Sequence, residues 1–164
     1  MKKILVISDS HISSFDQFPE EIKKLMNEVD LIIHCGDYTS YNVVKELKNF
    51  SNFYGVVGNA DDYKIEEELN KELIIKVEKV KIAVAHPFEG GPPMGIKYKL
   101  LEKFMNEHPD IILFGHTHFA EFSEYNKIKF FNPGSSTGKL PALFKSYGLI
   151  EIERDKINAG ILKI

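Results

Sequence analysis

Short apolar runs alternate with longer amphipathic stretches in the first third of the chain. Aliphatic runs with little polar interruption predict buried strands at residues 3–8, 30–34 and 53–57. Between them, apolar side chains recur at helical spacing over residues 18–29 and 41–50, which predicts two amphipathic helices. Strands that alternate with helices of this length are typical of βαβ units, so we expect a mainly parallel sheet.

Beyond residue 70 the strand-like runs follow one another more closely. Residues 73–77 and 81–85 predict one hairpin, and residues 146–153 and 156–164 predict another at the end of the chain. Residues 96–107 have the spacing of a third helix. Further strands are expected at residues 111–114, 120–125 and 128–131. The predicted fold class is α/β, a sandwich of two mixed β-sheets packed face to face with flanking helices.

The composition narrows the domain organisation and the partners. With 164 residues, 43% of them hydrophobic and 27% charged, we expect a single domain over residues 1–164. A net charge of −3 and dispersed lysines argue against a nucleic-acid polymer as partner. No apolar run approaches the ~20 residues that span a bilayer. Cys35 is the only cysteine, so we expect no intrachain disulfide and a cytoplasmic location. The composition leaves self-association into a homo-oligomer open.

Polar residues that can bind metals follow several of the predicted strands. The clearest case is Gly115-His116-Thr117-His118, because two histidines at positions i and i+2 of an extended chain point the same way. Asp9-Ser10-His11 and Gly36-Asp37 follow two earlier strands. Because ligands of parallel sheets lie beyond the carboxyl ends of the strands, a shared site is the economical explanation.

Each of these segments also has an ordinary structural interpretation. Asp9 and Gly36-Asp37 could be turn residues, and Gly58-Asn59-Ala60-Asp61-Asp62 could be the N-cap of a helix. His86 could be a buried histidine bonded to the backbone, and His34 a core or supporting group. The turn at residues 133–139 is too short for a phosphate-binding P-loop, and its amides could face an oxyanion instead.

Together the candidates form a mixed set of oxygen and nitrogen ligands. The set consists of Asp9, His11, Asp37, Asn59, His86, His116 and His118. Such a mixture suits Mn²⁺, Fe²⁺, Zn²⁺ or Ni²⁺ better than Ca²⁺ or Mg²⁺, which prefer oxygen ligands. Seven ligands exceed the needs of one ion, whereas two ions bridged by a carboxylate would use them well.

In this order the motifs resemble those of the calcineurin-like metallophosphoesterases, whose blocks read D-x-H, G-D, G-N-x-D, a lone H and G-H-x-H. The short length and the Asn132-Pro133-Gly134-Ser135 turn resemble the small bacterial and archaeal phosphodiesterase branch. The resemblance implies that one ion is held by Asp9, His11, Asp37 and His118. It implies that the other is held by Asp37, Asn59, His86 and His116, with Asp37 bridging. Asp37, Asn59 and His86 are expected to be catalytic as well as ligating.

The resemblance implies a metal-dependent phosphodiesterase that hydrolyses a small phosphodiester with a hydroxide held between two divalent ions, Mn²⁺ first among them. Two positions depart from the family pattern. Ala60 stands where larger members have a histidine thought to assist the leaving group, and His86-Pro87 replaces the H-G of a common T-H-G-H block. The alternative is a non-catalytic interaction scaffold, like the phosphoesterase-like subunit of the retromer coat. A mononuclear metal hydrolase would leave several ligands unused.

Overall fold

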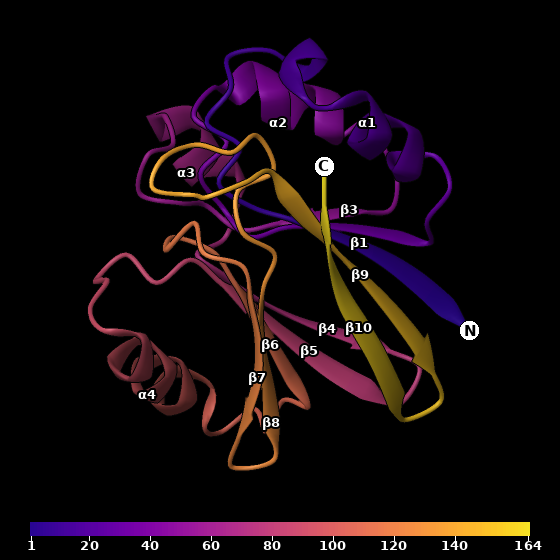
Figure 1. Ribbon diagram of the computed structural model, residues 1–164, viewed down its shortest axis with the longest axis vertical. Helices are drawn as coiled ribbons and strands as arrows, with labels where there is room; N and C mark the ends of the chain where they lie inside the picture. The colour runs from indigo at the N-terminus through magenta and orange to yellow at the C-terminus, as the bar shows by residue number, and fades with distance from the viewer.

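Two five-stranded sheets lie face to face in the computed structural model, which describes residues 1–164 (Figure 1). The first sheet has the strand order β10-β9-β1-β2-β3. Its strands are β1 (Lys2–Ile7), β2 (Leu31–His34), β3 (Phe53–Gly55), β9 (Ser146–Glu153) and β10 (Lys156–Lys163). β1, β2 and β3 are parallel, as the βαβ pattern predicts, and β9 and β10 form the antiparallel terminal hairpin.

The second sheet has the order β4-β5-β6-β8-β7 and is also mixed. Its strands are β4 (Glu72–Val77), β5 (Val80–Ala85), β6 (Ile111–Phe114), β7 (Glu121–Tyr125) and β8 (Ile128–Asn132). β4 and β5 form the predicted hairpin, and β6 lies parallel to both β5 and β8. The predicted sandwich of two mixed sheets is confirmed.

Helices cover the outer faces of both sheets (Figure 1). They are a 3₁₀ turn η1 (Phe15–Gln17), α1 (Glu20–Met26), α2 (Tyr41–Leu47), α3 (Tyr63–Glu68) and α4 (Pro93–Phe104). α1 and α2 are shorter than predicted. α4 starts and ends three residues earlier than predicted, because Pro93 suits the first turn of a helix. The prediction of three helices omitted α3, which is too short for a clear apolar period.

The uninterrupted apolar strands are buried on both faces. In β1, Ile4 and Val6 belong to the core between the sheets, whereas Leu5 and Ile7 pack in the cluster beneath α1 and α2. A third cluster joins the outer face of β5 and β6 to α4 through Leu100. Both faces of a central strand are therefore apolar, which is why these runs show no alternation.

The register brings the carboxyl ends of the parallel strands to one rim. Ile7 at the end of β1 pairs with His34 at the end of β2, and Ala85 at the end of β5 pairs with Phe114 at the end of β6. The loops that follow these strands leave both sheets at the same edge of the sandwich. None of the helices has the length and apolar character needed to cross a membrane.

Candidate metal centre

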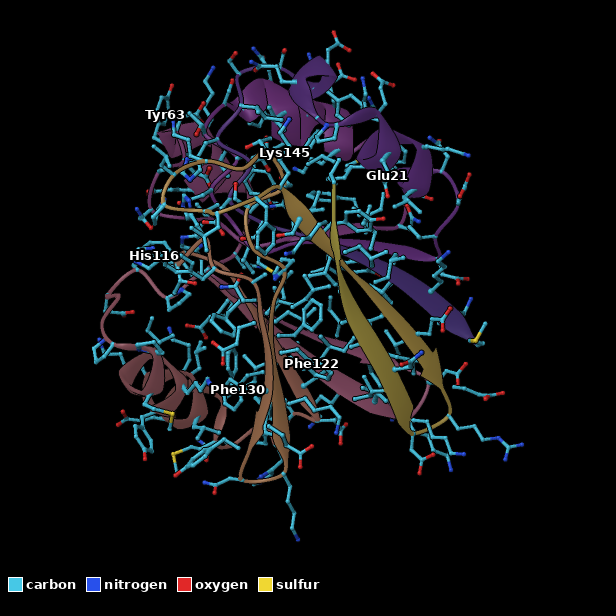
Figure 2. All side chains as sticks on the ribbon, in the orientation of Figure 1. Glu21, Tyr63, His116, Phe122, Phe130 and Lys145 are labelled. Carbon is cyan, nitrogen blue, oxygen red and sulfur yellow. The ribbon has the colours of Figure 1, made fainter.

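All seven candidate ligands come from loops at this rim. Asp9 and His11 follow β1, Asp37 follows β2, Asn59 follows β3, His86 follows β5, and His116 and His118 follow β6. Figure 2 shows His116 at this end of the second sheet, well away from Phe130 in β8. The side chains form two adjacent groups that share Asp37.

The first group contains Asp9, His11, Asp37 and His118, whose ligand atoms all lie within 4.8 Å of one another. His118 Nε2 lies 3.2 Å from His11 Nε2 and 3.4 Å from Asp9 Oδ1. His11 Nε2 lies 3.5 Å from Asp37 Oδ2. Two imidazole nitrogens and two carboxylate oxygens therefore converge on one point.

The second group is built around Asn59. Its Oδ1 lies 2.9 Å from His116 Nδ1 and 3.1 Å from His86 Nε2. His86 Nε2 lies 3.4 Å from Asp37 Oδ2, the same oxygen that faces His11 in the first group. Asp37 Oδ2 thus occupies the junction between the groups. The histidines of the G-H-x-H motif separate as the resemblance implies, with His116 in one group and His118 in the other.

Hydrogen bonds on the outer side of two rings fix which nitrogen faces the centre. His86 Nδ1–H donates to the Cys35 carbonyl at 2.7 Å, and His118 Nδ1–H donates to the Lys139 carbonyl at 2.8 Å. A carbonyl can only accept, so when either ring is neutral, as metal binding requires, its Nε2 carries a lone pair toward the centre. These lone pairs face other acceptors, including Asp37 Oδ2. A cation relieves this arrangement, and the residues therefore fit divalent metal ions.

Burial and neighbouring charges shift the pKa values of the ionisable groups of the centre in different directions. Burial raises the pKa of the Asp9 carboxyl and lowers the pKa of both His11 and His116. Burial alone would raise the pKa of Asp37, but the hydrogen bond and charge of His86 outweigh it and lower this pKa to about 2. Burial would lower the pKa of His86, and the nearby Asp37 and Asp9 raise it instead. Asp37 therefore carries a negative charge that attracts a cation.

The backbone is strained at five of the seven candidate ligands. Non-glycine residues rarely adopt positive φ, and this strain clusters at functional sites. The residues are Asp9 (φ 49°), His11 (48°), Asp37 (62°), His116 (78°) and His118 (61°). The left-handed conformation turns the backbone sharply where it leaves each strand. This turn brings the side chains of these residues toward one centre.

The close approach of the His86 ring requires a glycine at position 36. Gly36 has φ of 96°, and a Cβ there would lie 2.6 Å from Nδ1 of His86. Any side chain at this position would displace the His86 ring from the centre. The Gly-Asp pair therefore shapes the candidate centre and is not only an ordinary turn.

Of the residues that support the centre, His34 was proposed from the sequence, whereas Ser10 and Asp61 were not. Ser10 Oγ lies 2.5 Å from Nε2 of the buried His34, whose Nδ1 accepts from the Gly36 N–H at 3.2 Å. The Asp61 carboxylate accepts from the backbone N–H of Gly58 at 2.7 Å and of Thr39 at 2.8 Å. Burial raises the pKa of Asp61 to about 6, against the effect of these hydrogen bonds. His34 is thus the supporting group proposed for it.

The helix-cap interpretation of residues 58–62 is correct for its last residue only. Asp62 caps α3 by accepting from the Ile65 N–H at 3.3 Å. Asn59, three residues earlier, faces the two histidines of the second group. One segment therefore serves both purposes, because the chain turns between Asn59 and Asp62.

The amides of the turn at residues 133–139 could face an oxyanion by their sequence, but four of them are bonded within the protein. The Ser136 N–H donates to the Ser8 carbonyl, and the Lys139 N–H donates to the Ser135 hydroxyl. Ser135 Oγ in turn donates to the Asp9 carbonyl at 2.8 Å. The turn is a brace that holds the segment after β1.

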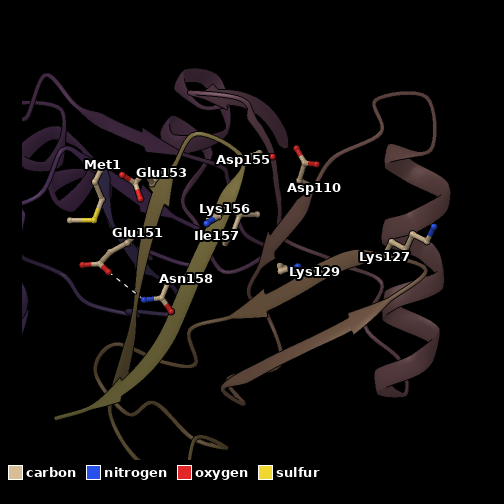
Figure 3. A pocket seen from close by; sticks show the side chains of 10 residues that line it. All are labelled: Met1, Asp110, Lys127, Lys129, Glu151, Glu153, Asp155, Lys156, Ile157 and Asn158. Carbon is tan, nitrogen blue, oxygen red and sulfur yellow. Dashed lines mark hydrogen bonds between the residues drawn. The ribbon is translucent and has the colours of Figure 1, made fainter.

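A wide hollow lies away from this rim (Figure 3). It has a volume of 660 Å³ and is lined near the amino end of β1 and the turns after β7 and β9. Its lining is mainly charged groups of both signs, such as Lys129 and Glu153, and Asn158 Nδ2 donates to Glu151 at 3.3 Å. None of the seven candidate ligands lines it.

Comparison with known protein families shows to which of them the chain is related. The calcineurin-like phosphoesterase superfamily domain matches residues 1–155. The chain belongs to the calcineurin-like phosphoesterase superfamily. Similar proteins from prokaryotes match nearly the whole length of this metallophosphoesterase. A probable metallophosphoesterase of Methanocaldococcus jannaschii is 34% identical over 164 residues, which is 97% of this chain and 80% of that protein. A phosphodiesterase of the same organism is 28% identical over 98% of this chain and 99% of its own length.

Solved structures of related proteins share the fold of this metallophosphoesterase. The solution structure of a Thermotoga maritima protein superimposes with a TM-score of 0.79 at 35% identity, covering 100% of both chains. Vacuolar Protein Sorting 29 from Cryptosporidium parvum superimposes with a TM-score of 0.76 at 22% identity, covering 99% of this chain and 97% of its own. The second likeness concerns the fold alone.

Proposed function

We propose that this metallophosphoesterase is a phosphodiesterase that uses two divalent metal ions. The observation that carries the proposal is the position of Asp37 Oδ2, which lies 3.5 Å from His11 Nε2 and 3.4 Å from His86 Nε2. One carboxylate oxygen that faces a histidine of each group suits a bridging ligand. Asp9, His11 and His118 would complete one site, and Asn59, His86 and His116 the other.

The donor set also supports the choice of ion and reaction. Four imidazoles with two carboxylates and one amide suit Mn²⁺, Fe²⁺, Zn²⁺ or Ni²⁺ better than Ca²⁺ or Mg²⁺, and among these we propose Mn²⁺ first because of the family resemblance. A relative of the same length is a phosphodiesterase, which supports a small phosphodiester as substrate. The single cysteine, Cys35, is buried and free, which suits the cytoplasmic location that we propose.

Two ions in such a site activate water as a nucleophile and stabilise charge on the entering and leaving oxygens. The residues of the chain hold this arrangement in place: His86 and His118 are each anchored through Nδ1 to a backbone carbonyl. Ala60 offers no side-chain proton, and its N–H donates to Asp37 Oδ1 at 2.8 Å. Without a donor at this position, esters with a good leaving group should react best.

The test is hydrolysis of an activated phosphodiester, bis(p-nitrophenyl) phosphate, by protein stripped of metal and then supplied with Mn²⁺. We expect turnover only with the metal, and its loss in His116→Ala because that variant removes a ligand of the second group. His108→Ala is the matched control, because His108 is exposed and lies at the end of the sandwich opposite the candidate centre. Full activity in excess chelator would refute the two-metal proposal.

The alternative function is an interaction scaffold. Leu140 and Leu143 are 82% and 83% exposed in the loop that follows Lys139, whose carbonyl holds His118. Exposed apolar side chains beside the candidate centre favour a protein partner there. Protein that binds Mn²⁺ but hydrolyses neither phosphodiesters nor phosphomonoesters would favour this scaffold over the enzyme.

A further inference from the structure

A second pocket opens directly beside the candidate metal centre. It has a volume of 320 Å³, at the lower end of the roughly 300–1,000 Å³ typical of small-molecule sites. Ile96 of α4 and Phe114 of β6 contribute apolar side chains, and Phe119 forms part of its wall. Phe119 is 48% exposed, so a face of its ring is accessible from the pocket.

His116 connects this pocket to the candidate centre. Its Nδ1 lies 2.9 Å from Asn59 Oδ1 on the side of the centre. Its Nε2 faces the pocket wall, because a Cβ added to Gly90 would lie 3.1 Å from that atom. The two nitrogens of one ring therefore face the two spaces. A phosphate group bound at the centre would have one of its ester groups directed past His116 into the pocket.

The pocket contains one carboxylate among its apolar walls. Glu121 Oε1 accepts from the Ser123 hydroxyl at 2.8 Å and pairs with the ammonium group of the buried Lys97. Both partners bind Oε1, so Oε2 is the oxygen available to a ligand. Lys97 neutralises the charge of Glu121, and the pocket does not repel an ester group attached to an anionic phosphate.

We propose that this pocket binds an uncharged aromatic ester group of the substrate, and that a hydrogen-bond donor on the ring binds Glu121. The exposed Phe119 supplies a face for a flat ring, and the apolar walls exclude water from it. The small volume favours one ring system over a polymer. This inference rests on the proposed function, because it assumes that the phosphate lies at the metal centre.

The test compares three phosphomonoesters that represent products of diester hydrolysis: methyl phosphate, phenyl phosphate and 3-hydroxyphenyl phosphate. Their dissociation constants are measured by calorimetry with Mn²⁺-loaded protein, and hydrolysis of bis(p-nitrophenyl) phosphate is assayed on the same preparation. We expect phenyl phosphate to bind about tenfold more tightly than methyl phosphate. The hydroxyl group should add a further gain of about threefold or more.

Two variants assign these gains to the pocket. Phe119→Ala should reduce the preference for phenyl over methyl phosphate and leave the affinity for methyl phosphate unchanged. Glu121→Gln should reduce only the gain from the hydroxyl group, because a neutral acceptor is weaker than a carboxylate. Phe122→Ala is the matched control, since Phe122 is 44% exposed, packs against Phe131 and does not line the pocket (Figure 2).

The possible outcomes distinguish failure of the proposed pocket from failure of the proposed phosphodiesterase function. Equal affinity for methyl and phenyl phosphate, together with metal-dependent hydrolysis, would overturn the pocket and leave the phosphodiesterase proposal standing. A preference for phenyl phosphate that survives in Phe119→Ala would also overturn it, because the ring would then bind elsewhere, as would a gain from the hydroxyl group that survives in Glu121→Gln. Absence of both hydrolysis and phosphate binding would refute the proposed function and the inference with it.

Discussion

Substitution of Gly115, the glycine before His116, tests how close packing fixes the positions of the candidate ligands. A Cβ at Gly115 would collide with the Ser8 hydroxyl and lie 2.9 Å from both Asp9 Oδ2 and the Cys35 carbonyl. Ordinary contacts of a Cβ begin near 3.4 Å. The Cys35 carbonyl belongs to the backbone and Ser8 is fully buried, so neither can yield without moving its strand. Gly115→Ala should therefore push the two sheets apart at the rim.

The expected cost has two parts. Overpacking of a close-packed interior destabilises by about 1–3 kcal/mol, and in a chain of this length each kcal/mol lowers Tm by about 2–4 °C. We therefore expect a decrease in Tm of roughly 2–12 °C. The His116 N–H donates to both oxygens of Asp9 at 3.1 Å, so displacement of Asp9 also disturbs His116. Loss of such orienting contacts weakens metal binding by about 10–100-fold.

The assay measures thermal unfolding in chelator and then a Mn²⁺ titration of the same protein. Gly160→Ala is the matched control, because Gly160 is exposed in β10 and a Cβ there would meet nothing within 4 Å. The free energy of unfolding of the control should stay within about 0.5 kcal/mol of that of the natural protein, and the control should bind Mn²⁺ equally well. If Gly115→Ala unfolds at the temperature of the control and keeps its metal affinity, the packing argument is wrong.

Three further predictions test the candidate centre and an ion pair at the opposite end of the first sheet. His34→Phe keeps a ring to stack on Tyr38 but removes both nitrogens, so unfolding in urea should show a loss of about 1–3 kcal/mol for each polar group left without a partner. In Mn²⁺ titrations, His118→Ala and His116→Ala should each lose a different site first, and identical losses would contradict the division. The backbone of Lys3 and the ammonium of Lys2 lower the pKa of Asp30, so its stabilisation is present above about pH 4 and disappears as the pH falls through the lowered pKa. Asp30→Asn should therefore be less stable than the natural protein at pH 7, and this difference should shrink progressively as the pH falls below about 4.

The strands could be predicted because burial on both faces leaves a strong sequence signal. β6 is purely apolar and β1 is apolar from Ile4 to Ile7, since one face packs between the sheets and the other under a helix. The helices were harder to delimit. α3 is a single short helix whose start depends on the Asp62 cap, and α4 begins at Pro93 inside a segment that composition marks as a loop. In both cases the boundary is set by local capping, which an apolar period does not report.

The convergence of the seven candidate ligands could be predicted because metal-binding side chains are few and their spacing along a strand end is informative. The supporting contacts could not, because they depend on which loops meet in space. Ser135 binds the Asp9 carbonyl across 126 positions of the chain. Nothing near Ser135 in the sequence indicates this contact. The bonding of the turn at residues 133–139 could not be predicted for the same reason, since its amides are used by Ser8 and by the turn itself.

The arrangement of the ligands between the two sheets explains why the inter-sheet core matters for chemistry. The first sheet supplies Asp9, His11, Asp37 and Asn59, and the second supplies three histidines. Each proposed ion therefore takes ligands from both sheets, so no single loop can set the distance between them. That distance is set by the apolar contacts of residues such as Val6 and Leu113, which lie one or two residues from the rim. Side chains that never touch the ions thus position them, because close packing allows the sheets only one separation.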